Sequence, residues 1–118
     1  MKLPNAENAV VDIAKIRDYC LNPHHPTGKH KARVFFEKLG ISQDDADRLR
    51  QSILEAVLIA DAIEQEASEF GRRFTVDFLL SWPEGIVLST AVVRTAWIIK
   101  NGEDFPRLTT CFNPQRSR

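Results

Sequence analysis

The chain has 118 residues, of which 43% are apolar and 27% are charged, which is the composition of one ordinary globular domain. No apolar run approaches the roughly 20 residues that a membrane span requires, and the first residues lack the apolar stretch of a signal peptide, so we expect a cytoplasmic protein. The two cysteines, Cys20 and Cys111, form no CxxC motif, which argues against a disulfide scaffold and a thiolate zinc site. We expect both to be small core residues, and we expect no cofactor.

Lysines and arginines balance aspartates and glutamates overall, but the charge is unevenly distributed. Residues 1–36 carry six basic and three acidic residues, residues 37–69 carry three and nine, and residues 70–118 carry seven and four. A neutral protein with this distribution can still offer a local basic face to an anion. The balance therefore permits a phosphate-bearing ligand without requiring one.

Three helices are predicted in the first part of the chain. Asp12 is a plausible N-cap for a helix that runs to about Leu21. A constrained turn with two prolines and a glycine follows over residues 22–28, and a second helix is expected from Lys29 or nearby to Leu39. A capping box formed by Ser42 and Asp45 opens a third helix, which should end before Gly71.

From residue 72 the apolar period changes to two, which is typical of strands. We expect a strand around Phe74 to Phe78, a turn at residues 82–85, a long and bent segment over 87–100, and a last strand over 108–112. The prediction is an α+β domain with a helical part (12–70), a three- to four-stranded antiparallel sheet (72–112) and a polar tail (113–118). The sheet face that the helices leave uncovered is the expected place for a ligand.

The densest group of functional side chains lies in residues 24–31, where three histidines and two lysines flank a turn that leads into a helix. Backbone N–H groups at a helix start favour anions, and Lys29 and Lys31 add positive charge. The Walker A pattern is absent. Zinc held by His25 and His30 is a weaker reading, because no Cys, Asp or Glu lies beside them to complete a site. The alternative is that residues 24–31 form a surface turn that water solvates and that binds no ligand.

Arg94 lies within an apolar strand, where a guanidinium needs an anionic partner. That partner is either Asp77 on the preceding strand, in a purely structural pair, or a ligand. Thr95 should point to the opposite sheet face. Thr109 and Thr110 alternate across the last strand, so one of them shares a face with Arg94. Trp97 is more typical of a core than of a base-stacking platform.

The motifs of serine hydrolases, zincins, dinucleotide enzymes and zinc ribbons are absent. Histidine, lysine, arginine and threonine remain as chemically useful residues. Metal-independent RNA cleavage needs little more than these: a base for the 2′-hydroxyl proton, an acid for the leaving 5′-oxygen, and cations that stabilise the phosphate. The same four residue types also occur in proteins that catalyse no reaction.

Several segments together resemble a small bacterial domain family, whose members occur free-standing and at the C-terminal ends of filamentous-haemagglutinin-like and contact-dependent toxins. The resemblance rests on Leu3-Pro4-Asn5-Ala6, the Leu21–Ala32 run, Phe74-Thr75-Val76-Asp77, Val93-Arg94-Thr95-x-Trp97-Ile98 and Pro106-Arg107-Leu108-Thr109-Thr110. Location at the end of a toxin implies an effector. Helices followed by an antiparallel sheet are similar to the barnase/EndoU/colicin/RelE-like ribonuclease fold, which is an analogy of fold and context.

The resemblance implies an RNase-like toxin domain that cleaves RNA without a metal. His30 or His25 is then the expected acid or base, Lys31 and Arg94 are phosphate ligands, and Thr95 or Thr109 donates hydrogen bonds. Further ligand-binding candidates are Lys29, Arg72, Arg73 and Trp97. RNA is the expected substrate, and a neutralising antitoxin or immunity protein the expected partner. The alternatives are a non-catalytic interaction domain, in which the acidic third helix binds a basic partner, and a phosphate-binding module.

Overall fold

The computed structural model describes residues 1–114, in which short helical segments precede two longer helices and one antiparallel sheet. The last four residues of the predicted tail, 115–118, lie outside the described part of the chain. The helical elements are η1 (Ala6–Asn8), α1 (Ile13–Lys15), η2 (Ile16–Cys20), α2 (Lys29–Leu39), η3 (Gln43–Asp45) and α3 (Ala46–Ala56). The strands are β1 (Ala62–Ser68), β2 (Gly71–Glu84), β3 (Val87–Lys100) and β4 (Arg107–Phe112).

The first two predicted helices form where the sequence places them. Asp12 caps α1 by accepting a hydrogen bond from the Ala14 N–H at 3.0 Å. The chain continues as one π-helical turn, η2, whose Ile16 carbonyl accepts from the Leu21 N–H at 2.9 Å. Helix α2 buries one apolar stripe and ends at Gly40, which adopts the left-handed conformation with φ of 71°. Both helices therefore form from local signals in the sequence.

The third helix begins as predicted and ends earlier. Ser42 and Asp45 form the capping box at η3, and α3 runs only to Ala56. The prediction kept residues up to 70 in the helical part, whereas Ala62–Ser68 is strand β1. Alanine, glutamate and glutamine in this segment favour a helix by intrinsic propensity. Pairing with β2, from Ala62 opposite Val76 to Ser68 opposite Gly71, overrides that propensity.

The sheet is an antiparallel meander in the order β1-β2-β3-β4. Strands β2 and β3 pair without interruption from Gly71 opposite Lys100 to Glu84 opposite Val87, so the segment expected to bend is one continuous strand. Trp82 and Pro83, expected in the turn, belong to β2, and the turn is made at residues 85 and 86. The prediction of an α+β domain, with helices before a three- to four-stranded antiparallel sheet, is confirmed, and the sheet has four strands.

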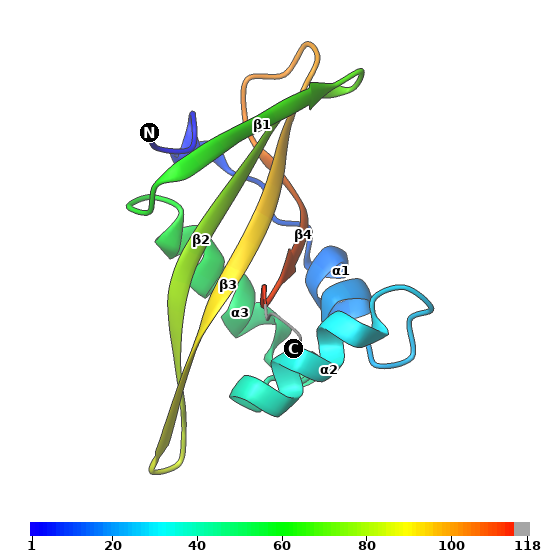
Figure 1. The fold of residues 1–118 in the computed structure, drawn as a ribbon, viewed down its shortest axis with the longest axis vertical. Helices are drawn as coiled ribbons and strands as arrows, with labels where there is room; N and C mark the ends of the chain where they lie inside the picture. The colour runs from blue at the N-terminus through cyan, green and yellow to red at the C-terminus, as the bar shows by residue number, and fades with distance from the viewer. Residues whose placement is uncertain (115–118) are drawn as a thin grey trace.

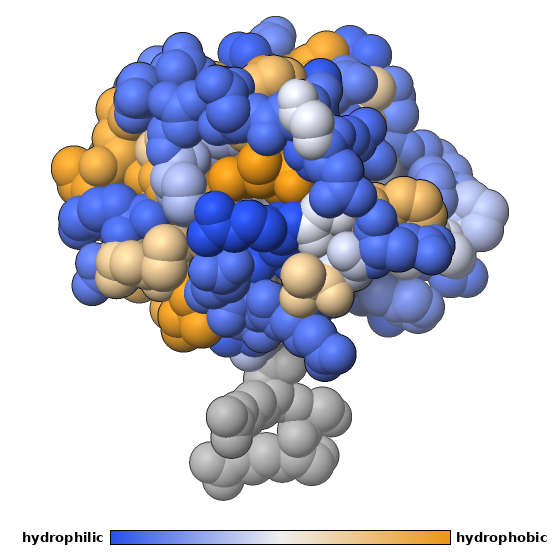
Figure 2. Space-filling view, turned by 90° about the horizontal axis from the view of Figure 1, so that it is seen from above, coloured by the Kyte–Doolittle hydropathy of each residue, from blue (hydrophilic) through white to orange (hydrophobic). Residues whose placement is uncertain are grey.

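One face of the sheet carries the core, with α3 behind it and α1 and α2 beside β4 (Figure 1). The alternation of β3 buries Val93, Thr95, Trp97 and Ile99 on that face and leaves Arg94 on the other. The far end of the β2–β3 hairpin extends beyond the helices (Figure 1), and Leu79, Ile86 and Leu88 are exposed there. At the opposite end of the molecule, Figure 2 shows a mainly hydrophilic surface with smaller hydrophobic patches. No helix among the described residues is long and apolar enough to cross a bilayer.

Candidate functional site

The turn between η2 and α2 is organised by the His25 imidazole. Its Nδ1 accepts hydrogen bonds from the backbone N–H groups of Thr27 at 3.1 Å and Gly28 at 3.0 Å, and lies 3.2 Å from the Thr27 hydroxyl. Because Nδ1 accepts, the ring proton lies on Nε2. A Cβ on Gly28 would lie 2.2 Å from the Tyr19 carbonyl oxygen, so only glycine allows α2 to begin this close to η2. The turn thus holds the start of α2 against Tyr19.

Lys31 lies in the first turn of α2 and connects η2 with β4. Its Nζ donates hydrogen bonds to the Tyr19 hydroxyl at 2.8 Å and the Thr110 hydroxyl at 3.0 Å. It also lies 4.7 Å from the centroid of the Tyr19 ring and 5.6 Å from that of Phe112. The His25 ring meets the Tyr19 ring edge-on, with centroids 4.8 Å apart. We call Tyr19, His25, Lys31, Thr110 and Phe112 the Lys31 cluster; all five are half-buried.

The charge of Lys31 is not matched by a carboxylate within residues 1–114. The salt bridges within residues 1–114 involve other cations, and both hydrogen-bond acceptors of Lys31 are neutral hydroxyls. The hydrogen bond from the Lys31 ammonium is the main cause that lowers the pKa of the Tyr19 phenol below its ordinary value, against the opposing effect of burial. A half-buried cation of this kind can take an anion as a further partner, beside a phenol that loses its proton more readily.

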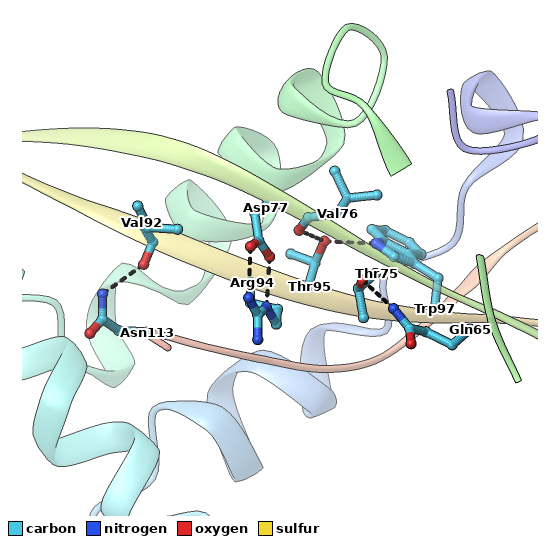
Figure 3. Close-up of polar contacts among 9 residues, drawn as sticks. All are labelled: Gln65, Thr75, Val76, Asp77, Val92, Arg94, Thr95, Trp97 and Asn113. Carbon is cyan, nitrogen blue, oxygen red and sulfur yellow. Dashed lines mark hydrogen bonds and ion pairs between the residues drawn. The ribbon is translucent and has the colours of Figure 1, made fainter. Parts of the chain in front are cut away.

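Arg94, in contrast, has its charge matched by a carboxylate. Asp77 lies directly opposite on β2, and the guanidinium donates to its two oxygens at 2.8 and 2.9 Å (Figure 3). The hydrogen bond to Asp77 raises the pKa of Arg94. The two side chains are 41% and 43% exposed, so this is a surface pair on the uncovered face of the sheet. The sequence allowed two partners for Arg94, namely Asp77 or a ligand, and the structure shows Asp77.

Thr95 and Trp97 lie on the opposite face, in the core. The Thr95 hydroxyl donates to the Val76 carbonyl at 2.8 Å and accepts from the Trp97 Nε1–H at 2.8 Å (Figure 3). Thr95 is 0% and Trp97 is 1% exposed. This hydroxyl therefore satisfies a buried indole, and neither side chain reaches a ligand on the surface.

The chain was compared with family models, with curated proteins and with solved structures. A model described as a domain of unknown function, DUF6883, matches residues 2–115. The chain belongs to the DUF6883 family. No curated protein and no solved structure matches it.

The other candidate residues of the DUF6883 domain are spread over the molecule. His30 is exposed on α2 and makes no side-chain hydrogen bond within the described residues. Lys29, in the first turn of α2, lines a groove of about 430 Å³ with Arg33 and Phe36. The remaining three, Thr109, Arg72 and Arg73, donate to the Ala96 carbonyl, the Glu64 carboxylate and the Glu66 carbonyl, respectively. Among the ten candidates, His25 and Lys31 are the two that the DUF6883 domain brings into the Lys31 cluster.

Tyr19, Thr110 and Phe112 are the members of the cluster that sequence reasoning missed as site residues. Thr110 was one of two alternating threonines, and a register shift between β3 and β4 at Ala96 and Trp97 decides their positions. Tyr19 is the single tyrosine of the chain, and nothing in its local sequence indicates that it meets Lys31. The cluster offers a cation, an acidified phenol and an imidazole N–H, which is a set suited to phosphate chemistry.

Proposed function

We propose that this DUF6883 domain is an RNA-cleaving effector of the toxin type, which acts without a metal and whose active site is the Lys31 cluster. The observation that carries the proposal is the Lys31 ammonium, held between two neutral hydroxyls and free of a carboxylate partner within residues 1–114. The resemblance to toxin C-terminal domains and the order of helices before an antiparallel sheet also support it.

In the proposed reaction, the RNA 2′-oxygen attacks the neighbouring phosphorus, and the bond from phosphorus to the 5′-oxygen breaks. Tyr19, in its ionised form, takes the 2′-hydroxyl proton, since Lys31 lowers the pKa of this phenol. Lys31 stabilises the charge that develops on the phosphate and gives a proton to the leaving 5′-oxygen. Transfer of the Tyr19 proton to Lys31, along their 2.8 Å hydrogen bond, then restores both groups.

His25 has a different role here from the acid or base suggested by the sequence. Its Nδ1 already accepts hydrogen bonds from two backbone N–H groups of the turn, so it is not free to act as a base. Its Nε2–H is a poor acid, because a neutral imidazole that loses this proton becomes an anion. We therefore assign the Nε2–H of His25 as a hydrogen-bond donor that orients the phosphate. Phe112 contributes an apolar ring beside the cation.

The test is cleavage of total cellular RNA by purified protein in EDTA, with Lys31→Met as the variant and Lys38→Met as its control. Methionine keeps most of the lysine stem, and Lys38 is an exposed lysine of the same helix. We expect Lys31→Met to lower the rate by on the order of 100-fold, as loss of one group that stabilises transition-state charge does elsewhere. Lys38→Met should stay within about twofold, the range of a surface change remote from the chemistry.

Two results would contradict the proposal. One is wild-type cleavage no greater than that of a mock purification. The other is a folded Lys31→Met variant that cleaves as fast as Lys38→Met. In the second case a nuclease activity exists, but the Lys31 cluster is not its site.

A second candidate function is a non-catalytic interaction domain, of the accessory or immunity type. The Arg94–Asp77 pair favours it, because this pair removes one expected phosphate ligand. The exposed apolar side chains at the far end of the β2–β3 hairpin, Leu79, Ile86 and Leu88, also fit a protein partner better than RNA. A stable complex with a protein from the same cell, together with no RNA cleavage, is the result that favours this function.

A further inference from the structure

The two cysteines of the chain meet in the core, where η2 packs on β4. Cys20 is the last residue of η2, and Cys111 lies in β4. The Cys20 sulfur accepts a hydrogen bond from the Cys111 backbone N–H at 3.4 Å and lies 3.6 Å from the Thr110 hydroxyl. Both thiols are free and 0% exposed. Two residues 91 positions apart in the sequence thus meet, with the Cys20 sulfur against the Cys111 backbone.

The surroundings make the two thiols unequal. A hydrogen bond from the Cys111 thiol is the main cause that lowers the pKa of Cys20 to about 7, and the Cys111 N–H, Thr110 and Lys31 act in the same direction. The same thiol contact and complete burial raise the pKa of Cys111 well above its ordinary value. Near neutral pH part of the Cys20 population is therefore thiolate beside a protonated Cys111 thiol, and a thiolate next to a thiol is the combination that reacts with an oxidant and then closes a disulfide.

We propose that Cys20 and Cys111 are an oxidation site of this domain, at which hydrogen peroxide converts the neighbouring thiols into a disulfide that ties η2 to β4. Peroxide is the chosen oxidant because it is small and uncharged, whereas both sulfurs lie in the core. The proposal does not rest on the proposed RNA cleavage, although Thr110 of the Lys31 cluster lies 3.6 Å from the Cys20 sulfur.

The reaction has two steps. The Cys20 thiolate attacks one peroxide oxygen, the O–O bond breaks, and hydroxide leaves and becomes water, which gives a sulfenic acid on Cys20. The Cys111 thiol then loses its proton and attacks the Cys20 sulfur; the S–O bond breaks and a second water forms. Two thiols are oxidised by two electrons in total, and one peroxide is reduced to two waters.

The test is mass spectrometry of the folded protein after exposure to millimolar peroxide. We expect a loss of about 2 Da, reversed by dithiothreitol, and a non-reduced digest that contains the Cys20–Cys111 linked peptide. Peptide mapping separates this change from oxidation of Met1, the single methionine. The same protein unfolded in urea should form the link at least about tenfold more slowly, because the fold no longer holds the sulfurs together.

The Cys111→Ala variant provides the matched control. It should form no link. Its Cys20 should react more slowly, because the Cys111 thiol no longer lowers the pKa of Cys20, and should carry a sulfenic acid that dimedone traps, because no second thiol is at hand. If Cys111→Ala does not fold, Cys20→Ala replaces it as the variant that should form no link. The proposal is overturned if the folded wild type keeps its mass, forms links between chains instead, or gains oxygen at either cysteine without forming the internal disulfide.

Discussion

Lys31 and Arg94 are two cations of similar burial whose surroundings differ in one respect. Arg94 faces a carboxylate that accepts two of its hydrogen bonds, whereas Lys31 faces two hydroxyls. A hydroxyl satisfies the hydrogen-bonding capacity of an ammonium without neutralising its charge, while a carboxylate does both. The resemblance to toxin domains implied that both residues are phosphate ligands. Their partners differ, however: Asp77 neutralises the charge of Arg94, whereas the hydroxyls leave the charge of Lys31 able to attract an anion.

The largest effect expected from this difference concerns Tyr19. Tyr19→Phe keeps the ring on which His25 and Lys31 pack and removes the hydroxyl that accepts from Lys31. If this hydroxyl is the base, RNA cleavage should fall by roughly 100- to 10,000-fold. The measurement is the cleavage rate in EDTA beside the far-ultraviolet dichroism of the variant. A folded Tyr19→Phe protein within about threefold of the wild-type rate, far below the loss of a positioned base, excludes this role.

The influence of Lys31 on Tyr19 can be measured without any substrate. Tyr19 is the single tyrosine, so the alkaline rise of tyrosinate absorbance reports this residue alone. Its midpoint should lie below the ordinary pKa of 10.0 in the wild type, because the nearby ammonium favours the phenolate. Lys31→Met removes that charge and should move the midpoint upward, whereas Lys38→Met should not. A midpoint unaffected by Lys31→Met contradicts the described contact.

The next effect concerns Thr95, the neighbour of Arg94 whose partners all lie within the core. Thr95→Val keeps the shape and leaves the buried Trp97 N–H without its acceptor. We expect the free energy of unfolding to fall by about 1–3 kcal/mol. Urea unfolding measures it, with Thr109→Val as the control, because that exposed hydroxyl should cost no more than about 0.5 kcal/mol. Equal losses for the two variants would show that the indole does not depend on Thr95.

The sequence was informative wherever a structural signal is local. The apolar spacing of residues 29–39, the following glycine and the Ser42–Asp45 capping box each predict a feature that forms. Strand β1 was missed because its residues favour a helix and become a strand through pairing with β2. The direct pairing of Asp77 with Arg94 was foreseeable, since both lie on neighbouring strands of one hairpin.

The Lys31 cluster could not be predicted in the same way. Tyr19 lies 12 positions and Thr110 lies 79 positions from Lys31, so the contacts depend on how η2 and α2 pack beside β4. The choice between Thr109 and Thr110 depends on a register shift that the alternating pattern of a regular strand does not contain. Sequence reasoning named Lys31 as a candidate but not the groups that surround it.

The smallest effect on stability and on RNA cleavage is expected for substitution of Arg94. This substitution tests the comparison of Lys31 with Arg94 most directly. Its pair with Asp77 is a cross-strand contact between half-exposed side chains, so a double-mutant cycle of Arg94→Ala and Asp77→Ala should give a coupling energy of about 0.2–1 kcal/mol. Arg94→Ala should change RNA cleavage by less than about threefold, because a guanidinium held by a carboxylate contributes little further attraction to a phosphate. If Arg94→Ala instead loses as much activity as Lys31→Met, then Arg94 must leave Asp77 to bind RNA. The partner that a cation has in the free protein would then not decide its role, and the active site would extend from the Lys31 cluster onto the uncovered face of the sheet.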